Sequence, residues 1–522
     1  MRTILYLVCL IFLSVVPQLQ SAEPVDVDLL LRGGSLIDGT GKPVFVGDVG
    51  IQRGKIVAVG QFEVGQVGKS LDCSGLTIVP GFIDLHNHSD FEIIAARTRA
   101  CINYLTQGCT TIVTGNCGSG PVDTGAYYKQ MDQLGMGVNV AHLLPQGSLR
   151  REVMGLDQRE ASNDEIERMR TLAEKAMQDG AWGMSSGLIY VPSSYADTNE
   201  LAEIAKVVGK YGGIYASHIR NENLELLTAI NEAIQIGQRS GCPVHVSHFK
   251  ASGQDAWGMV RAASEIIEAA RKNGHRVTAD QYPYAASSTS LEASVIPTWA
   301  RAGGEQKLLE RLANPDQNTR IHHEIEKKLK LADGGERFKI ARYAKNPAWA
   351  GRDIAAIASQ RQVPPLDIVL EITKNGGASI VNFGMNEQDV RFVMTLPWVA
   401  TASDGRAYVP GADVPHPRSY GTFSRKIGYY AIREKQLSLE QAIHSASGLP
   451  AEILGLTDRG KLEAGLAADI VVFDSASFID TATYESPHRY STGVRHVIIN
   501  GDFAILDGTP TGTLSGKVLR KR

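Results

Sequence analysis

The central part of the chain alternates short apolar runs with longer amphipathic stretches. The stretches 162–180 and 223–241, for example, repeat apolar residues at helical spacing, and each ends at a glycine, as many helices do. Eight apolar runs typical of buried strands follow one another: TIVPGFIDL, TTIVTG, VNVAHLL, WGMSSG, GIYASH, PVHVSH, RVTAD and WVATASD. Eight strand–helix units predict an α/β fold, a (β/α)8 barrel of the TIM type over residues 80–455.

The two ends of the chain have a different pattern. Residues 23–79 and 456–522 contain short apolar runs separated by turns, as in GDVGIQRGKIVAVG and VRHVIINGDFAI, which is typical of antiparallel strands. We therefore predict a composite β-sandwich domain built from both termini. The gap between the seventh and eighth barrel strands, about 284–396, is far longer than one helix requires, so we predict an insertion over the mouth of the barrel.

Residues 1–22 have the pattern of a secretory signal peptide. Arg2 precedes the apolar run ILYLVCLIFLSVV, and small residues follow near Ala22. Because the run is short for a bilayer span, we expect export to the periplasm or the medium, with no membrane contact after cleavage. An uncleaved N-terminal anchor is the alternative.

Composition and charge narrow the class of function. The 522 residues are 43% hydrophobic and 21% charged, as in ordinary globular proteins. The net charge of -3 provides no field that would attract nucleic acid or anionic lipid, so we expect a small-molecule partner. Five cysteines follow residue 22, an odd number that does not indicate a disulfide framework, and we expect one of them to bind metal. No feature of the sequence points to a particular oligomeric state.

Side chains that can bind a metal follow several of the predicted barrel strands. They are His86 and His88 after the first strand, Cys117 after the second, His218 after the fifth, His248 after the sixth and Asp404 after the eighth. Each alone has a plainer explanation, such as a solvated histidine, a buried apolar cysteine or a helix cap. Barrel enzymes carry their catalytic residues at this end of the strands, so the convergence of all six favours a metal site.

Six other histidines do not share this placement. His245 precedes His248 by three residues, an odd offset that places the two side chains on opposite faces of a regular strand. We therefore interpret the following as structural or surface residues: His245, His322, His323, His444, His488 and His496.

Several motifs together resemble those of the amidohydrolase superfamily. PGFIDLHNHSD indicates the superfamily, while GNCG, SHIRNE, SHFK, DQYPY, SDG and HPRSYGTF resemble the D-aminoacylase (N-acyl-D-amino-acid deacylase) family over nearly the whole mature chain. The resemblance implies zinc-dependent hydrolysis of the amide bond of N-acyl-D-amino acids, which yields a carboxylate and a free D-amino acid.

The resemblance also implies a metal arrangement. One zinc ion would be held tightly by Cys117, His218 and His248, and a second, weaker position would use His86 and His88 with the Cys117 sulfur shared. A thiolate and two imidazoles suit Zn²⁺. Many relatives outside this branch bridge two metals with a carboxylated lysine on the fourth strand, but WGMSSG contains no lysine.

Further residues match positions that act on the substrate in the family. Asp404 would move a proton from water to the leaving nitrogen. Tyr190, Lys250 and Tyr282 match positions that hold the acyl carbonyl or the carboxylate, although each could instead support a metal ligand. Arg418 matches a carboxylate-binding arginine, whose planar fork suits that anion.

Two other functions remain as alternatives. A cyclic amidase of the hydantoinase or dihydroorotase type would share the barrel and the paired histidines, but the GNCG motif and the missing lysine argue against it. A non-catalytic barrel homologue would be expected to have lost metal ligands, whereas this chain retains all six candidates.

Overall fold

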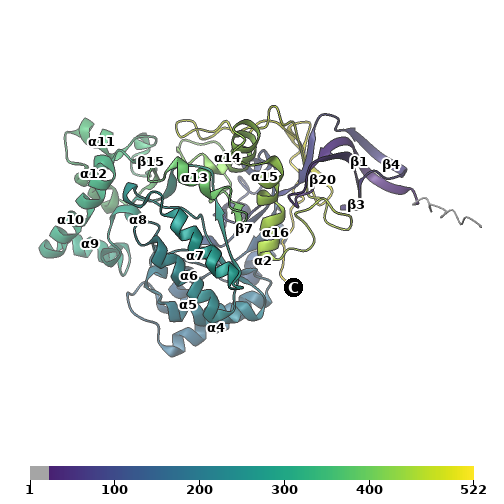
Figure 1. Cartoon of the computed structure of the whole chain (residues 1–522). Coiled ribbons are helices and arrows are strands. Elements are labelled where there is room, and N and C mark those ends of the chain that lie inside the picture. Colours follow the sequence, from purple (N-terminus) through teal and green to yellow (C-terminus); the bar gives the residue numbers. More distant parts are fainter. Residues whose placement is uncertain (1–22) are drawn as a thin grey trace, which may run out of the picture.

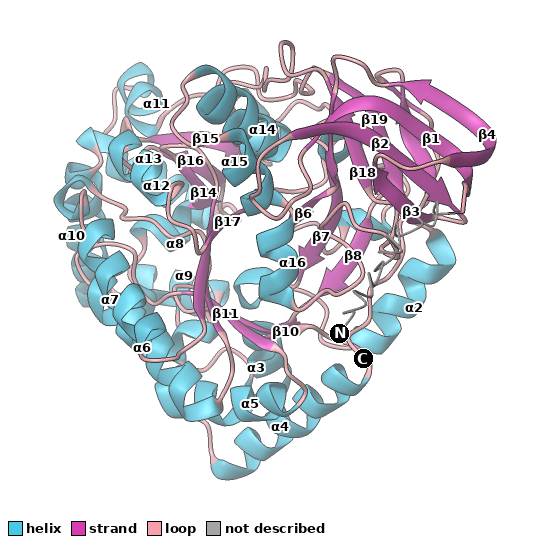
Figure 2. Ribbon diagram, turned by 45° about the vertical axis from the view of Figure 1, so that its right-hand side comes forward, coloured by secondary structure: helices cyan, strands magenta, loops and turns pink. Residues whose placement is uncertain are grey.

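The computed structural model describes residues 23–522, and the predicted signal segment 1–22 lies outside them. The parallel strands of the barrel are β6 (Phe82–Asp84), β7 (Cys109–Thr114), β8 (Asn139–His142), β9 (Leu144–Pro145), β10 (Gly183–Gly187), β11 (Ile214–His218), β12 (Val244–Val246), β13 (Val277–Gln281) and β17 (Val399–Thr401). β8 and β9 are separated by one residue and occupy the position of one barrel strand. The prediction of an eight-stranded α/β barrel is therefore confirmed (Figure 2).

The ring closes next to the predicted metal ligands. The backbone N–H of Asp404, just after β17, donates to the carbonyl of His86, just after β6, at 2.8 Å. The N–H of His88 donates to the carbonyl of Gly405 at the same distance. These bonds join the first and last strands, and they place Asp404 beside His86 and His88.

Helices pack around the outside of the strands (Figure 2). They are α1 (Ile102–Leu105), α2 (Thr124–Leu134), α3 (Gln146–Met154), α4 (Asn163–Gln178), α5 (Thr198–Lys210), α6 (Leu226–Ser240), α7 (Val260–Lys272), α13 (Glu387–Val393), α14 (Arg418–Ser424), α15 (Leu439–Ala446) and α16 (Gly448–Leu454). Their ends follow local chemistry. Ser162 and Glu165 form a capping box at the start of α4, and α6 ends at Gly241, whose φ of 76° is left-handed.

No helix within 23–522 combines the length and apolarity that a membrane crossing requires.

Strands from both termini pair in a composite sheet at one end of the molecule (Figure 1). They are β1 (Val25–Leu36), β2 (Phe45–Gln52), β3 (Lys55–Gly60), β4 (Val64–Asp72), β5 (Thr77–Pro80), β18 (Ile470–Phe473), β19 (Val494–Ile499), β20 (Asp502–Leu506) and β21 (Thr509–Pro510). Strand β18 joins the two ends by pairing with β5.

All the strands of the composite domain belong to one hydrogen-bonded sheet. Strand β1 pairs with β2 along one edge, and its other edge is divided between β4, at Val25–Arg32, and β5, at Ser35 and Leu36. A register shift between Leu31 and Gly34 lies at the division. The irregularity lets one long strand bridge both parts of the sheet.

The last residues of the chain leave this sheet and pack on the amino-terminal end of the barrel. Val140 in β8 donates its N–H to Lys517 and accepts from Leu519, at 3.0 and 2.8 Å. The indole N–H of Trp182 donates to the carbonyl of Leu519 at 2.7 Å. The C-terminal tail therefore closes the end of the barrel opposite the predicted site.

The segment between β13 and β17 has a core of its own. It contains β14 (Ser287–Ser290), α8 (Leu291–Val295), α9 (Glu305–Ala313), α10 (Pro315–Leu331), β15 (Phe338–Arg342), α11 (Ile354–Arg361), α12 (Pro365–Lys374) and β16 (Ser379–Asn382). Ile321, Ile340, Ile354 and Ile380 are fully buried within it. Its helices lie at the end of the molecule away from the composite sheet (Figure 1), and β14 lines the cavity described below.

Candidate metal centre

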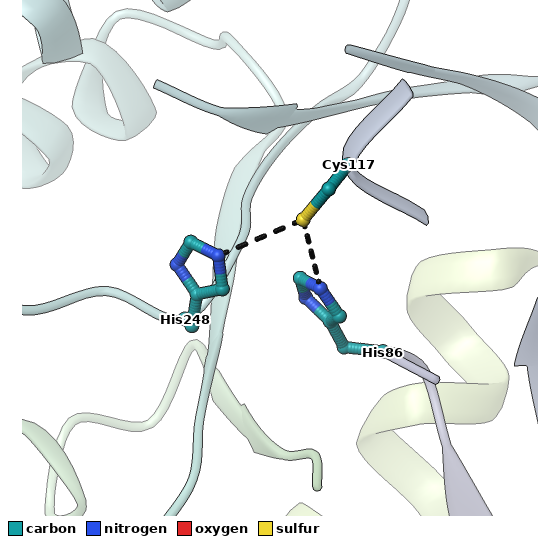
Figure 3. A group of neighbouring side chains, drawn as sticks. All are labelled: His86, Cys117 and His248. Carbon is teal, nitrogen blue, oxygen red and sulfur yellow. Dashed lines mark hydrogen bonds between the residues drawn. The ribbon is translucent and has the colours of Figure 1, made fainter. Parts of the chain in front are cut away.

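Cys117 is turned back into the barrel by an unusual backbone conformation. It lies in a short turn (Asn116–Gly118) after β7 and has a φ of 50°, which is left-handed, as are Gly115 and Gly118 on either side. Its Sγ lies 3.2 Å from His86 Nε2, 3.5 Å from His218 Nδ1 and 3.7 Å from His248 Nε2. Figure 3 shows the sulfur between the rings of His86 and His248.

The atoms of Cys117, His218 and His248 have the spacing of a tetrahedral zinc site. With Zn–N near 2.0–2.1 Å and Zn–S near 2.3 Å, ligand atoms stand about 3.3 Å apart for two nitrogens and about 3.6 Å apart for nitrogen and sulfur. The observed separations are 2.9 Å between the two histidine nitrogens and 3.5 and 3.7 Å to the sulfur. The donor set therefore fits zinc, and all three residues line one cavity.

A second group of metal-binding side chains lies next to the Cys117 sulfur. His88 Nε2 lies 3.0 Å and His86 Nε2 lies 3.6 Å from Asp404 Oδ1. His86, His88 and Asp404 can together approach one ion, and so can His86, Cys117 and His248. The structure thus brings together all six predicted metal and proton-transfer residues.

The electrostatics distinguish Cys117 from the other cysteines. Burial raises the pKa of its thiol, but the nearby His86, His218 and His248 lower it well below the usual value. Burial raises the pKa of Cys73 and Cys242 to about 11, and all the cysteines within 23–522 are free of disulfides. Only a thiolate binds zinc strongly, so this setting suits Cys117 for the predicted role.

Asp404 and Arg418 form an ion pair beside the donors. Arg418 Nη1 lies 2.7 Å from Asp404 Oδ2, and its guanidinium group lies 4.8 Å from the ring centre of Tyr282. Burial raises the pKa of Asp404, but Arg418 and three nearby histidines, His86, His88 and His248, hold it well below its usual range. The carboxylate is therefore ionised and able to accept a proton.

Glu222 is a site residue that the sequence analysis missed. Its Oε1 lies 2.8 Å from His248 Nδ1 and 2.6 Å from Lys250 Nζ, and its Oε2 lies 4.0 Å from His218 Nε2. Burial raises the pKa of Glu222, but Lys250, His248 and His218 have the larger effect and lower it below its usual value. A carboxylate behind a metal-binding imidazole fixes which nitrogen faces the metal. The signal was present in SHIRNE, where Glu222 follows His218 by four residues.

Lys250 contacts two site residues: its Nζ lies 2.6 Å from Glu222 Oε1 and 2.8 Å from His248 Nδ1. The hydroxyl of Tyr190 lies 3.0 Å from Thr289 Oγ1 in β14, and its ring centre lies 5.1 Å from that of His218. The predicted substrate-binding residues, Tyr190, Lys250, Tyr282 and Arg418, all line the same cavity of about 1390 Å³. Their roles stay predictions, but their placement allows them to contact a molecule bound at the metal.

The predicted orientation of His245 is wrong, although a structural role for it is not contradicted. Its Nε2 lies 2.8 Å from Asp280 Oδ2, and the same oxygen lies 3.4 Å from His86 Nδ1, so His245 faces the side of the metal ligands. The alternation assumed for a regular strand stops because β12 ends at Val246 and His248 has a left-handed φ of 37°. Asp280, at the end of β13, was likewise missed as a site residue.

Comparison with known proteins agrees with this geometry. A model of the amidohydrolase family matches residues 69–505. A D-aminoacylase of Alcaligenes xylosoxydans xylosoxydans is 35% identical over 95% of this chain and 98% of that protein. A solved D-aminoacylase, studied for one-metal activation and second-metal attenuation in its binuclear centre, has a TM-score of 0.81 and 32% identity, covering 95% of this chain and all of its own, 100%.

A solved N-acyl-D-glutamate deacylase from Bordetella bronchiseptica is similar to the same degree. It has a TM-score of 0.81 and 30% identity, covering 95% of this chain and 100% of its own. That structure contains zinc and a phosphonate inhibitor that mimics the tetrahedral intermediate of its reaction.

Proposed function

The chain belongs to the amidohydrolase family, and on that premise we propose that it hydrolyses N-acyl-D-amino acids to a carboxylate and a free D-amino acid. The observation that carries the proposal is the convergence of the Cys117 thiolate with His218 and His248 at zinc-ligand spacing, next to the ionised Asp404. The similarity to a D-aminoacylase and to a zinc-containing N-acyl-D-glutamate deacylase supports both the substrate class and the metal.

Cys117, His218 and His248 would hold the tight zinc ion, while His86 and His88, with the Cys117 sulfur, would form the weaker position. When bound, zinc lowers the pKa of a coordinated water toward ~7 and polarises the amide carbonyl. Asp404 accepts a proton from the attacking water and donates it to the amide nitrogen, which is a poor leaving group until it is protonated. When the weaker metal position is empty, His88 Nε2, 3.0 Å away, is placed to donate a hydrogen bond to this carboxylate.

Arg418 is the group that recognises the α-carboxylate of the substrate. Its planar fork suits a carboxylate, and in this structure it already pairs with the carboxylate of Asp404. Binding of the substrate would give Arg418 a second anion next to the scissile bond. The contacts of Lys250 with Glu222 and His248 instead favour the alternative role, which is support of a metal ligand.

A hydrolysis screen of the zinc-loaded protein tests this function. We expect release of free amino acid from N-acetyl-D-amino acids, with little release from the L enantiomers and no opening of hydantoin. Activity on hydantoin alone would instead support the cyclic amidase. Purified protein that binds no zinc and hydrolyses none of these compounds would support the non-catalytic homologue.

We also propose that the protein is exported through residues 1–22, on the strength of the Arg2 charge, the apolar run and the small residues near Ala22. Expression of the full chain with a C-terminal tag, followed by cell fractionation and mass measurement of the mature amino terminus, tests the proposal. A full-length protein retained inside the cell would contradict it.

A further inference from the structure

The carboxylate of Asp280 contacts both halves of the metal centre. Its Oδ1 accepts a hydrogen bond from the backbone N–H of His248 at 2.6 Å. Its Oδ2 lies 2.8 Å from His245 Nε2 and 3.4 Å from His86 Nδ1. Asp280 is 1% exposed, so these groups from β6, β12 and β13 are brought together away from solvent.

The contact with His248 stabilises a strained backbone. A residue other than glycine with a left-handed φ, here 37°, costs of order 1–3 kcal/mol unless its surroundings hold it. The bond from the His248 N–H to Asp280 supplies such a hold. It keeps the imidazole where Nε2 lies 2.9 Å from His218 Nδ1 and 3.7 Å from the Cys117 sulfur.

The contact with His86 concerns which ring nitrogen is available to a metal. Because a carboxylate beside Nδ1 favours a proton on that nitrogen, it leaves Nε2 free to bind. His86 Nε2 is the nitrogen that lies 3.2 Å from the Cys117 sulfur and 3.6 Å from Asp404. His86 Nδ1 makes no hydrogen bond, so it is the charge of Asp280, 3.4 Å away, that favours the tautomer that the weaker metal position needs.

His245 fixes the carboxylate from behind. Its Nδ1 lies 2.9 Å from Thr278 Oγ1, while its Nε2 faces Asp280. This chain of contacts from Thr278 through His245 limits rotation of the Asp280 carboxylate. A carboxylate that cannot rotate can hold the two metal-binding histidines in a constant relation to each other.

The two metal positions differ in how many carboxylates support them. His248, in the tight position, has Glu222 on its ring at 2.8 Å in addition to Asp280 on its backbone. For His86 Nδ1, Asp280 is the only carboxylate within 4.0 Å among residues 23–522. Loss of the Asp280 carboxylate should therefore affect the weaker position more than the tight one.

We propose that Asp280, fixed by His245, is a positioning residue shared by both metal positions and that it controls the occupancy of the weaker one. The proposal rests on the two-position metal site of the proposed function. It concerns metal binding, which is measured without substrate, so its failure can be distinguished from a failure of the hydrolytic assignment.

The variant Asp280→Asn tests the proposal because it changes only part of the contacts. The amide oxygen can still accept from the His248 N–H, but the amide NH2 in place of Oδ2 would face His245 Nε2 and His86 Nδ1 without an oxygen to accept from them. We expect the tight zinc to remain and the affinity of the weaker position to fall about 10–100-fold, the usual effect of losing such a partner.

The measurement is a titration of metal-depleted protein with Zn²⁺ against a competing chelator, and with Co²⁺ followed by its visible spectrum. Glu222→Gln is the matched control, since it removes the carboxylate behind the tight position and should weaken the first binding step instead. His245→Phe, which releases Asp280 without changing it, should weaken the second step by a smaller factor.

Three results would overturn the proposal. One is an unchanged second step in Asp280→Asn, and another is a wild-type protein that binds a single metal even at excess Zn²⁺. The third is an equal loss of both steps together with a lowered melting temperature, which would mean that Asp280 serves only the fold. Weakening confined to the second step, with an unchanged melting temperature, supports it.

Discussion

Buried charged groups are hydrogen-bonded to different extents at the two ends of the barrel. At the closed end, Asp469 pairs with Arg459 and accepts hydrogen bonds from the Asn139 amide at 2.9 Å and from the Asn500 N–H at 2.8 Å. At the open end, Arg418 Nη1 is buried and makes no hydrogen bond, although the Asp404 carboxylate lies 2.7 Å away.

The difference separates groups that hold the fold from groups that await a ligand. A buried polar cluster whose members satisfy one another stabilises a single structure, whereas incompletely paired groups carry a cost that a bound ion or substrate can offset. The closed end also joins the barrel to the composite sheet, through Asn139 in β8 and Asp469 beside β18 (Figure 2). Substitutions at this end should change stability, and those at the open end should change metal content and turnover.

Cys117→Ala should have the largest effect. It removes the only thiolate of the tight site, so we expect loss of the tightly bound zinc and of activity, while the melting temperature of the metal-free protein stays nearly unchanged. Metal analysis of dialysed protein and a D-aminoacylase assay measure this. Zinc content and turnover at wild-type levels would contradict a metal-binding role for the Cys117 thiolate.

Asp404→Asn should lower kcat by about 10²–10⁴-fold and leave the tight zinc bound. The amide is nearly isosteric but cannot accept the proton of the attacking water. Steady-state kinetics and metal analysis on the same sample separate the two properties. High residual turnover would show that another group carries the proton.

Arg418→Met should raise KM and lower kcat/KM by roughly 2–5 kcal/mol in transition-state terms, because the contact with the substrate carboxylate is lost. The control is an N-acyl amine without the carboxylate, against which the variant should lose little. Equal losses on both substrates would mean that Arg418 supports the site through Asp404, 2.7 Å away, and does not recognise the substrate.

Arg459→Met, at the closed end, should lower the free energy of unfolding by about 3 kcal/mol, since Asp469 would stay buried without its cation. Zinc content and kcat should stay within twofold of the wild type. Denaturant unfolding and kinetics on the same sample check this. A variant with normal stability and reduced turnover would contradict the division between the two ends.

Lys426→Met should differ from the other variants in sign, because it should be stabilising. Lys426 is 1% exposed, its Nζ has no hydrogen bond, and burial lowers its pKa from 10.5 to about 7. Below pH 7 the folded protein buries this charge, so we expect the variant to be more stable there by about 1–4 kcal/mol.

The pH dependence gives a second measurement on the same variant. Between pH 7 and 10.5 the unfolded chain binds more protons at this lysine than the folded one, so wild-type stability from this group rises with pH in that window. Lys426→Met should abolish the rise, while the control Lys129→Met, at a lysine on the surface helix α2, should keep it. Parallel stability curves for the wild type and Lys426→Met would show that Lys426 keeps the pKa of the unfolded chain and is therefore solvated and charged.

Much of the barrel and its metal donors could be predicted from the sequence. Buried strands require apolar runs, and catalytic residues of barrels lie where those runs end, so His218 and His248 stand out in the sequence alone. The supporting carboxylates could not be found in the same way. Asp280 belongs to β13 and acts on residues of β6 and β12, contacts that exist only once the strands are arranged in a ring.

Backbone geometry explains the other differences. The position of His248 relative to His245 follows from the left-handed φ of His248, and the alternation of side chains along a regular strand does not predict such a φ. The continuous sheet follows from a register shift in β1, and the packing of the C-terminal tail follows from burial of Leu519 beside Trp182. The sequence alone determined which residues can bind zinc and move a proton, since those are properties of side chains. Only the tertiary structure decided which groups support them, because that support depends on distances between segments far apart in the chain.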